Sequence, residues 1–248
     1  MLWTVFPIHL CYRVRLKRLE ARVIPWTLID TAIMPDGGGE LRLKQRGSEF
    51  SIMLGAIELM NSRLSGSEEA LARLSYERIR THARPHMLIG GLGMGFTLRA
   101  ALAELPKDAR ITVGELVPAV VAWARGPMAE VFSGCLDDAR VVIREGDVGH
   151  LIKSASSGYD AILLDVDNGP EGLTRRANDD LYSVSGLRAA RKALRPNGVL
   201  SVWSSAPDAG FTRRLRDAGF AVEELSVRAS TKGRGARHVI WMATRNGS

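Results

Sequence analysis

After Pro85, short apolar segments alternate with segments whose apolar residues recur at helical spacing. Residues 86–89 are typical of a short buried strand, and residues 96–104 follow with the pattern of a helix. Two late segments, 220–227 and 238–243, have no helix between them, which predicts a closing antiparallel pair. The alternation predicts the α/β class, with a doubly wound, Rossmann-like sheet of seven strands. The other expected strands are 110–115, 140–144, 160–165 and 199–203, and the other expected helices are 118–125, 185–194 and 211–218.

A smaller unit is expected before this sheet. Alternating apolar and polar residues on both sides of a glycine-containing turn predict a β-hairpin of strands 40–46 and 49–54, with a third strand at 56–60. Residues 65–68, Ser-Gly-Ser-Glu, form a candidate capping box for a helix over 69–82. The expected domains are a basic N-terminal extension (1–22), a small N-terminal β unit (23–64) and a Rossmann-like domain (65–248).

The charge of the chain is unevenly distributed. Lys and Arg number 34 against 27 Asp and Glu, a formal net charge of +7. The excess lies in residues 1–22 and 209–248, and the centre is slightly acidic. A domain that coats nucleic acid would spread basic residues over one face of the fold. Nucleic acid is therefore not the expected partner, although the basic C-terminal segment leaves an anionic partner open. The six residues of this basic C-terminal segment that would hold such a partner are Arg213, Arg214, Arg216, Lys232, Arg234 and Arg237.

The cysteines and the apolar N-terminal stretch help to predict the cellular compartment of the protein. Cys11 and Cys135 are too few and too far apart for a disulfide framework, which fits a reducing cytoplasm. Residues 1–12 are too short to cross a bilayer, and their basic cluster follows them instead of preceding them as in a secretion signal. The five histidines form no spaced ligand set, so no metal is expected. We expect a cytoplasmic protein without a membrane span.

A glycine-rich loop follows the first strand of the predicted sheet. Residues 90–95, Gly-Gly-Leu-Gly-Met-Gly, lead directly into a helix. Glycine there permits a tight turn, close approach of a ligand to the backbone and exposure of the N–H groups at the helix start. Glu115 ends the next strand, at the spacing where an acid accepts hydrogen bonds from ribose hydroxyls. The pattern predicts a nucleoside or nucleotide ligand; a glycine turn used only for packing is the alternative.

Further acids follow the later strands. Asp147 comes after the third strand, where a carboxylate can accept from an adenine amino group or cap the next helix. Asp165 closes the fourth strand, with Asp167 two residues later. Two nearby carboxylates repel each other and attract cations, as a cationic cofactor or an amine requires. Residues 167–170 also fit a simple turn in which Asp167 is a local acceptor.

The segments around these acids carry a resemblance. From about residue 39 to residue 244 the chain resembles the spermidine synthase family, the polyamine aminopropyltransferases of the class I S-adenosylmethionine-dependent transferase fold. The resemblance implies that Glu115 holds the ribose, that Asp147 lies by the adenine, and that Asp165 accepts a proton from the attacking amine or orients it. The matching stretches are 88–99, 114–121, 136–141, 145–147, 159–165 and 193–200. The cofactor residues expected from it are Gly91, Gly93, Gly95, Glu115, Leu116, Asp147 and Val148, and the catalytic residues are Asp165 and Asp167.

Three departures from the family pattern concern the substrates. The family's glycine loop includes an Asp that favours the decarboxylated cofactor, whereas this loop has Met94 in that region. The family's Tyr-His-Glu segment, which helps to hold the polyamine, is absent from its expected place near residues 69–72. The loop after Asp165 is shorter than in the family. The cofactor half of the family site is therefore retained and the acceptor half is altered.

These observations leave three hypotheses. The first is a transferase of polyamine biosynthesis that moves an aminopropyl group from decarboxylated S-adenosylmethionine to a small-molecule amine, with Asp165 as base and Asp167 neutralising the acceptor's charge. The second is a methyltransferase that uses intact S-adenosylmethionine and a different acceptor. The third is a nucleoside-binding protein without catalytic activity. The resemblance also implies a homodimer, formed through the small N-terminal unit.

Overall fold

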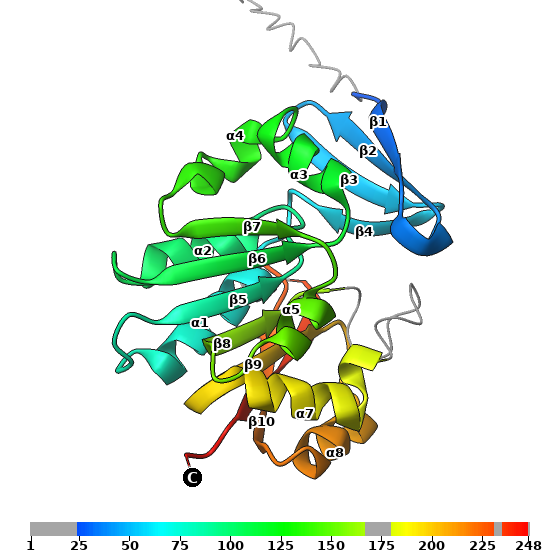
Figure 1. Ribbon diagram of the computed structural model, residues 1–248. Coiled ribbons are helices and arrows are strands. Elements are labelled where there is room, and N and C mark those ends of the chain that lie inside the picture. The colour runs from blue at the N-terminus through cyan, green and yellow to red at the C-terminus, as the bar shows by residue number, and fades with distance from the viewer. Residues whose placement is uncertain (1–23, 167–179, 231–234, 248) are drawn as a thin grey trace, which may run out of the picture.

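The computed structural model describes residues 24–166, 180–230 and 235–247. Its larger sheet has seven strands in the order β10-β11-β9-β8-β5-β6-β7 (Figure 1). Neighbouring strands from β7 to β9 are parallel, and β11 runs antiparallel to both β9 and β10. The predicted fold class and the closing antiparallel pair are confirmed. The strands are β5 (His86–Gly90), β6 (Arg110–Glu115), β7 (Val141–Glu145), β8 (Tyr159–Leu164), β9 (Leu194–Ser204), β10 (Ala221–Arg228) and β11 (Arg237–Thr244).

Two apolar clusters cover the two faces of this sheet. Alternate residues of a strand point to opposite faces. Met87 and Ile89 of β5 accordingly belong to the cluster with the helices α1 (Gly66–Ile79) and α2 (Phe96–Glu104). Leu88 belongs to the other cluster. That cluster contains the helices α5 (Val148–Ser154), α7 (Val184–Ala193) and α8 (Ala209–Asp217). Helices on both faces leave the strand ends as the accessible part of the sheet.

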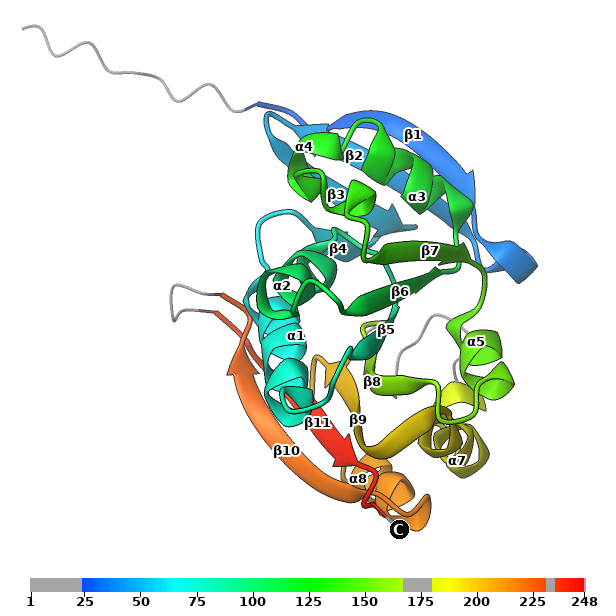
Figure 2. The same ribbon diagram turned by 60° about the vertical axis from the view of Figure 1, so that its left-hand side comes forward.

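A second, antiparallel sheet of four strands lies at one edge of the molecule, next to α3 (Pro118–Arg125) and α4 (Ala129–Phe132) (Figure 2). Its buried side chains, such as Leu43 and Ile52, join the same core cluster as Val121 of α3. The indole Nε1 of Trp123 donates a hydrogen bond to Asp30 Oδ2 (2.7 Å), which ties α3 to the first strand. The strands are β1 (Thr27–Ile33), β2 (Glu40–Arg46), β3 (Glu49–Leu54) and β4 (Ile57–Asn61), and the short 3-10 helices of the chain are η1 (Pro35–Gly37) and η2 (Cys135–Asp137).

The division into domains stays a prediction. β4 ends at Asn61 and α1 begins at Gly66, which brackets the expected boundary at residue 64. The expected N-terminal extension, 1–22, lies outside the described residues.

Strand β1 is absent from the sequence-based prediction. Its pairing with β2 shifts register between Leu28 and Asp30, so a bulge breaks the alternation by which a strand is recognised. β1 is an edge strand, and Leu28 and Ile33 are 53% and 70% exposed. The predicted homodimer stays a prediction.

The ends of two other elements also differ from expectation. α1 begins at Gly66, and Ser65 makes no side-chain capping bond, so the predicted capping box is wrong. β9 begins at Leu194, because Leu194 pairs with Tyr159 before a register shift in the β8–β9 pairing. Pro196 lies within the irregular segment, where its missing N–H is tolerated.

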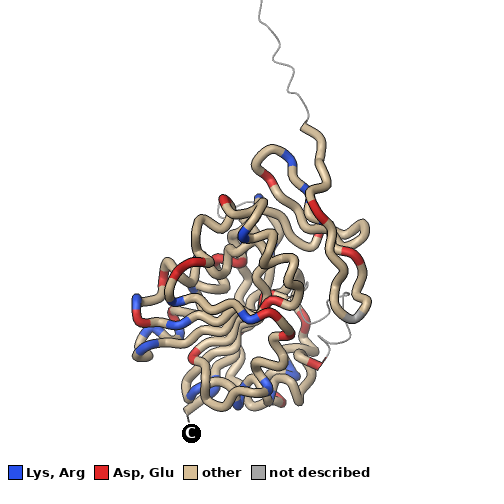
Figure 3. The backbone as a smooth tube through the Cα atoms, turned by 45° about the horizontal axis from the view of Figure 1, so that its top comes forward, with Lys and Arg blue, Asp and Glu red and all other residues tan. Residues whose placement is uncertain are grey.

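Basic and acidic positions are interspersed along the described backbone (Figure 3). Two arginines of the basic C-terminal segment have local partners: Arg214 forms an ion pair with Asp208 (3.2 Å), and Arg237 Nε donates to Ser226 Oγ (3.1 Å). Lys232 and Arg234 lie outside the described residues. An anionic partner at this segment therefore stays a prediction. Within the described ranges, no helix is long and apolar enough to cross a membrane.

Candidate functional site

Two adjoining cavities lie at the carboxyl ends of the central strands. β5 lies between β6 and β8, so the order of the chain reverses there, and such a reversal is where open α/β sheets bind ligands. We call the first the main cavity; its walls include Gly91, Glu115, Asp147 and Val166. We call the second the side pocket; its walls include Glu68, Asn61, Met94, Phe96 and Trp203. The residues that line both are Leu59, Met60, Gly93 and Asp165.

The glycine loop between β5 and α2 forms one wall of both cavities. Gly91 has φ of +90°, and a Cβ atom there would lie 2.6 Å from the carbonyl oxygen of Asp165, closer than any side chain permits. Gly93, which also has a positive φ, lies where the two cavities meet. Gly95 differs from expectation, because its missing Cβ makes room for the ring of Phe132 and it does not line either cavity.

Glu115 ends β6 and is 7% exposed. Its Oε2 accepts a hydrogen bond from the N–H of Leu92 (2.8 Å), and its Oε1 accepts one from the N–H of Val117 (2.8 Å). Burial raises the pKa of this carboxyl, although the backbone N–H groups stabilise its charged form. Each carboxylate oxygen has a second lone pair that a ligand hydroxyl can use. Glu115 therefore fixes the glycine loop and presents an acceptor to the main cavity.

Asp147 lies at the end of β7 and caps α5. Its Oδ1 accepts from the N–H of Gly149 (2.7 Å), so the predicted capping role is confirmed. Asp147 also lines the main cavity together with Val148 and Leu116, so the structure brings these three predicted cofactor residues to one wall.

Asp165 follows β8 at the junction of the two cavities. Its Oδ2 accepts a hydrogen bond from the hydroxyl of Thr97 (2.9 Å), a residue of α2 that no sequence motif singles out. Burial raises the pKa of Asp165 to about 6, and the Thr97 hydrogen bond opposes the shift. The predicted companion, Asp167, lies outside the described residues.

Glu68 is the residue of the site that sequence reasoning missed. It lies in the first turn of α1 and lines the side pocket beside Asp165. Burial and the negative charge of Asp165 raise the pKa of Glu68 to about 7. Its Oε2 accepts a hydrogen bond from the hydroxyl of Ser67 (2.7 Å), whose oxygen lies 2.9 Å from Nδ1 of His238. The pair Glu68 and Asp165 makes the side pocket acidic, which favours cationic ligands.

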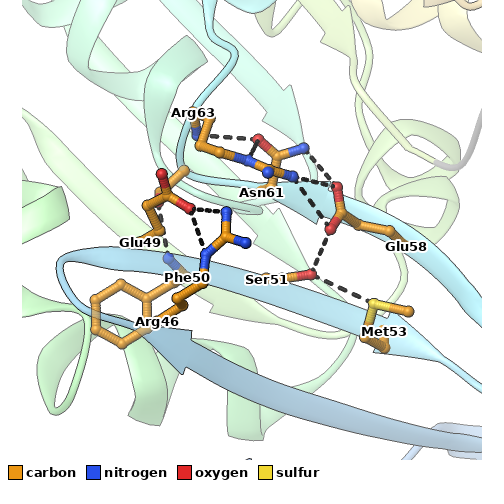
Figure 4. Close-up of polar contacts among 9 residues, drawn as sticks. Arg46, Glu49, Phe50, Ser51, Met53, Glu58, Asn61 and Arg63 are labelled. Carbon is orange, nitrogen blue, oxygen red and sulfur yellow. Dashed lines mark hydrogen bonds and ion pairs between the residues drawn. The ribbon is translucent and has the colours of Figure 1, made fainter. Parts of the chain in front are cut away.

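Strand β4 supplies the wall on the side of the smaller sheet. The carboxylate of Glu58 accepts hydrogen bonds from Asn61 (2.7 Å), Ser51 (2.8 Å) and Arg63 (3.2 Å) (Figure 4). Asn61 Oδ1 in turn accepts from the backbone N–H of Arg63 (2.9 Å). This network ties the end of β4 to Ser51 of β3, and β4 carries Leu59 and Met60, which line both cavities.

Metal binding has no structural support in the described ranges. No group of three or more His, Cys, Asp or Glu side chains there is placed to hold an ion. Cys135 is a free, buried thiol, and burial raises its pKa to about 11. The expectation of a site without metal stays a prediction.

Sequence comparison relates the chain to one group of proteins. No protein-family model matches it. It is 31% identical over 169 residues to a polyamine aminopropyltransferase of Mycobacterium tuberculosis, an alignment that covers 64% of this chain and 31% of the relative. It is 32% identical over 128 residues to one of Nitrosomonas europaea, covering 51% and 38%. The chain thus spans about a third of the length of these curated relatives.

Solved structures show the same fold. Spermidine synthase from Thermotoga maritima superposes with a TM-score of 0.67 at 18% identity, covering 89% of this chain and 73% of that one. A spermidine synthase in complex with the transition-state analogue AdoDATO superposes with a TM-score of 0.66, at the same identity and coverage. Sequence and fold together confirm the resemblance to the spermidine synthase family.

Proposed function

We propose that this chain, a sequence relative of the polyamine aminopropyltransferases, transfers an aminopropyl group from decarboxylated S-adenosylmethionine to an amine. One observation carries the proposal: Asp165 lies where the main cavity meets an acidic side pocket. A group at this junction can contact both a cofactor whose nucleoside fills the first cavity and an amine that reaches the junction through the second. Such placement of two reactants supplies much of the rate of a bimolecular reaction.

The residues of the main cavity fit an S-adenosylmethionine-type cofactor. Glu115 offers carboxylate oxygens for the ribose hydroxyls, and Asp147 offers one for the adenine amino group. The backbone at Gly91 approaches the end of β8 too closely for a side chain, so a glycine there lets the loop form the cavity wall next to Asp165. When bound, the cofactor supplies a sulfonium-activated carbon, and displacement there by the amine nitrogen releases methylthioadenosine.

Asp165 is the proposed base. The attacking amine must lose a proton as its nitrogen bonds to carbon, and a carboxylate within hydrogen-bond reach accepts it. Thr97 occupies Oδ2, so Oδ1 is the oxygen proposed to accept from the amine. The raised pKa of Asp165 brings the carboxyl closer to the pH at which it is an effective base. Leu59 and Met60 give the junction apolar walls, which are proposed to limit the access of water. Asp167 is proposed to neutralise acceptor charge, on sequence alone.

The methyltransferase hypothesis keeps one supporting observation. Met94 lines the side pocket as a neutral residue of the glycine loop, and it offers no charge against the carboxylate of intact S-adenosylmethionine. Glu68 and Asp165 supply negative charge in the same pocket, so we rank aminopropyl transfer first.

Calorimetric titration with decarboxylated S-adenosylmethionine, the intact form and methylthioadenosine tests the proposal. We expect the decarboxylated form and methylthioadenosine to bind, and a labelled aminopropyl group to move to one of a panel of primary aliphatic amines. Tighter binding of the intact form, with methyl transfer, would establish the methyltransferase instead. Binding without any turnover would leave a nucleoside-binding protein.

Asp147 offers a test of the adenine assignment. D147A should lower the free energy of unfolding by about 1 kcal/mol, because the capping acceptor for the N–H of Gly149 is lost. D147S keeps a capping oxygen and should retain most of that stability. Both variants lack the carboxylate, so both should bind methylthioadenosine more weakly. Chemical denaturation and calorimetry measure the two effects separately, and wild-type affinity in D147S would contradict the assignment.

A further inference from the structure

The side pocket has an unbalanced charge. Its described lining includes two carboxylates, Glu68 from α1 and Asp165 from the end of β8, and no Lys or Arg. Their mutual repulsion is relieved when a cation binds between them or when a proton is taken up. A negatively charged ligand group that enters this pocket is repelled by both carboxylates.

The two acids have different positions along the path from the main cavity. Asp165 and Gly93 line both cavities, so they lie where a ligand passes from one to the other. Glu68 lines only the side pocket, beyond that junction. A cofactor whose nucleoside occupied the main cavity would extend its three-carbon tail past Gly93 and Asp165 toward Glu68. That pose would put Asp165 beside the reacting carbon and Glu68 by the end of the tail.

We propose that Glu68 is the residue that selects decarboxylated over intact S-adenosylmethionine, by binding the ammonium group of the cofactor tail and repelling a tail carboxylate. This inference rests on the proposed function. It assigns to α1 the selectivity that a neutral Met94 in the glycine loop does not provide.

Neighbouring groups hold the Glu68 carboxylate in place. The Ser67 hydroxyl donates to its Oε2 (2.7 Å), and Ser67 is itself 1% exposed and held by the ring of His238. These contacts keep the side chain turned into the protein, unlike Glu69, which lies on the wall of a separate surface hollow between α1 and α2.

One group in the side pocket favours the intact cofactor, which carries a tail carboxylate. The indole N–H of Trp203 is buried without a hydrogen-bond partner among the described residues, and it can donate to an oxygen of a tail carboxylate. It is one neutral donor, whereas Glu68 and Asp165 both repel a tail carboxylate and attract an ammonium. The two charges outweigh the single hydrogen bond, so the pocket keeps a net preference for the ammonium.

The experiment compares binding of both cofactor forms to wild type, E68Q and E69Q by calorimetry at pH 8. Wild type should bind the decarboxylated form at least about tenfold more tightly than the intact form, as expected from one charge-assisted hydrogen bond. E68Q keeps the shape of the side chain and should lose most of this preference. E69Q is the matched control from the next position of the helix and should keep it. E68D retains the charge and should keep a partial preference, which a merely structural role of Glu68 would not produce.

Lowering the pH is a second measurement that needs no variant to fold. Glu68 faces Asp165 from β8, Glu69 on its own helix, and His238 of β11 through Ser67. Protonation of the two pocket carboxyls removes the charge that selects the cofactor, so the preference of wild type should decline as the pH falls from 8 to below 6. The decline should be smaller in E68Q.

The outcomes separate this inference from the function on which it rests. Wild type that binds neither cofactor form, or that binds the intact form more tightly, overturns both. Wild type that prefers the decarboxylated form, with an unchanged ratio of affinities in E68Q, overturns the role of Glu68 and leaves aminopropyl transfer standing. A preference that does not vary with pH contradicts the role of Glu68 in the same way.

Discussion

Replacing Asp165 with asparagine should lower the rate of aminopropyl transfer by about a hundredfold or more, as expected when a general base is removed. Asparagine has nearly the same shape, and its amide oxygen can still accept the hydrogen bond from Thr97. The amide cannot take a proton from the amine, so the loss should appear in kcat. Methylthioadenosine binding should survive, because Glu115 and Asp147 hold the nucleoside. Radiolabel transfer and calorimetry measure the two quantities.

D217N is the matched control, since Asp217 is an exposed carboxylate at the end of α8 and lines neither cavity. It should transfer the label at the wild-type rate. Full activity of D165N would remove Asp165 from the mechanism.

The pH dependence of the wild-type rate follows from the same residue. Burial raises the pKa of Asp165 to about 6, and burial together with the charge of Asp165 raises the pKa of Glu68 to about 7. The base must be deprotonated to act, so the rate should fall as the pH drops through this range. In D165N the remaining rate should lose the part of this dependence that belongs to Asp165. An identical acid limb in both proteins would show that another group titrates.

The meeting of the three acids in one cavity could be predicted because each follows a strand of the parallel sheet. Glu115, Asp147 and Asp165 lie at the carboxyl ends of β6, β7 and β8, and parallel strands bring these ends to the same edge. Apolar runs between turn residues are strong signals, and α2, β6 and α3 begin and end as predicted. Which role each acid performs is a matter of chemistry that spacing does not decide.

Glu68 could not be found in this way. The pattern Ser-Gly-Ser-Glu has the spacing of a capping box, which is a local explanation for an acid in the first turn of a helix. In the structure, the packing of α1 beside β8 brings Glu68 near Asp165, which lies 97 positions away in the sequence and whose negative charge repels it. Local rules treat such a residue as satisfied by its neighbours. The contact depends on tertiary packing, which no single segment of the sequence specifies.

Thr97 and β1 are two further features that the periodicity of the sequence does not predict. Thr97 lies in a segment predicted correctly as helix, but its hydrogen bond to Asp165 depends on the distance between α2 and β8. β1 contains strand-forming residues, yet the bulge between Leu28 and Asp30 interrupts their alternation. Both cases involve geometry that period-based rules do not include.

Replacing Glu115 with glutamine should lower the affinity for methylthioadenosine by about a hundredfold, with a much smaller effect on folding. Both carboxylate oxygens of Glu115 accept backbone N–H groups, from Leu92 and from Val117. In glutamine, an NH2 group replaces one of the two oxygens and faces a backbone N–H group that needs an acceptor. The glycine loop therefore loses a hydrogen bond, and the ribose loses an acceptor. A hydrogen bond to a charged acceptor contributes about 1.5–3 kcal/mol, so the loss of one such bond to the ribose accounts for the expected change.

The small effect on folding has its own physical cause. Burial raises the pKa of Glu115, so the ionised carboxylate carries a cost in the folded protein that a neutral glutamine does not. This gain offsets part of the lost backbone hydrogen bond, and the free energy of unfolding should change by no more than about 2 kcal/mol. Glu145 pairs with Glu115 in the β6–β7 register, is exposed and lines neither cavity, which makes E145Q the matched control. Calorimetry and chemical denaturation of both variants measure affinity and stability. Equal losses of affinity in E115Q and E145Q, or a loss in E115Q that only follows unfolding, would contradict a direct contact of Glu115 with the nucleoside.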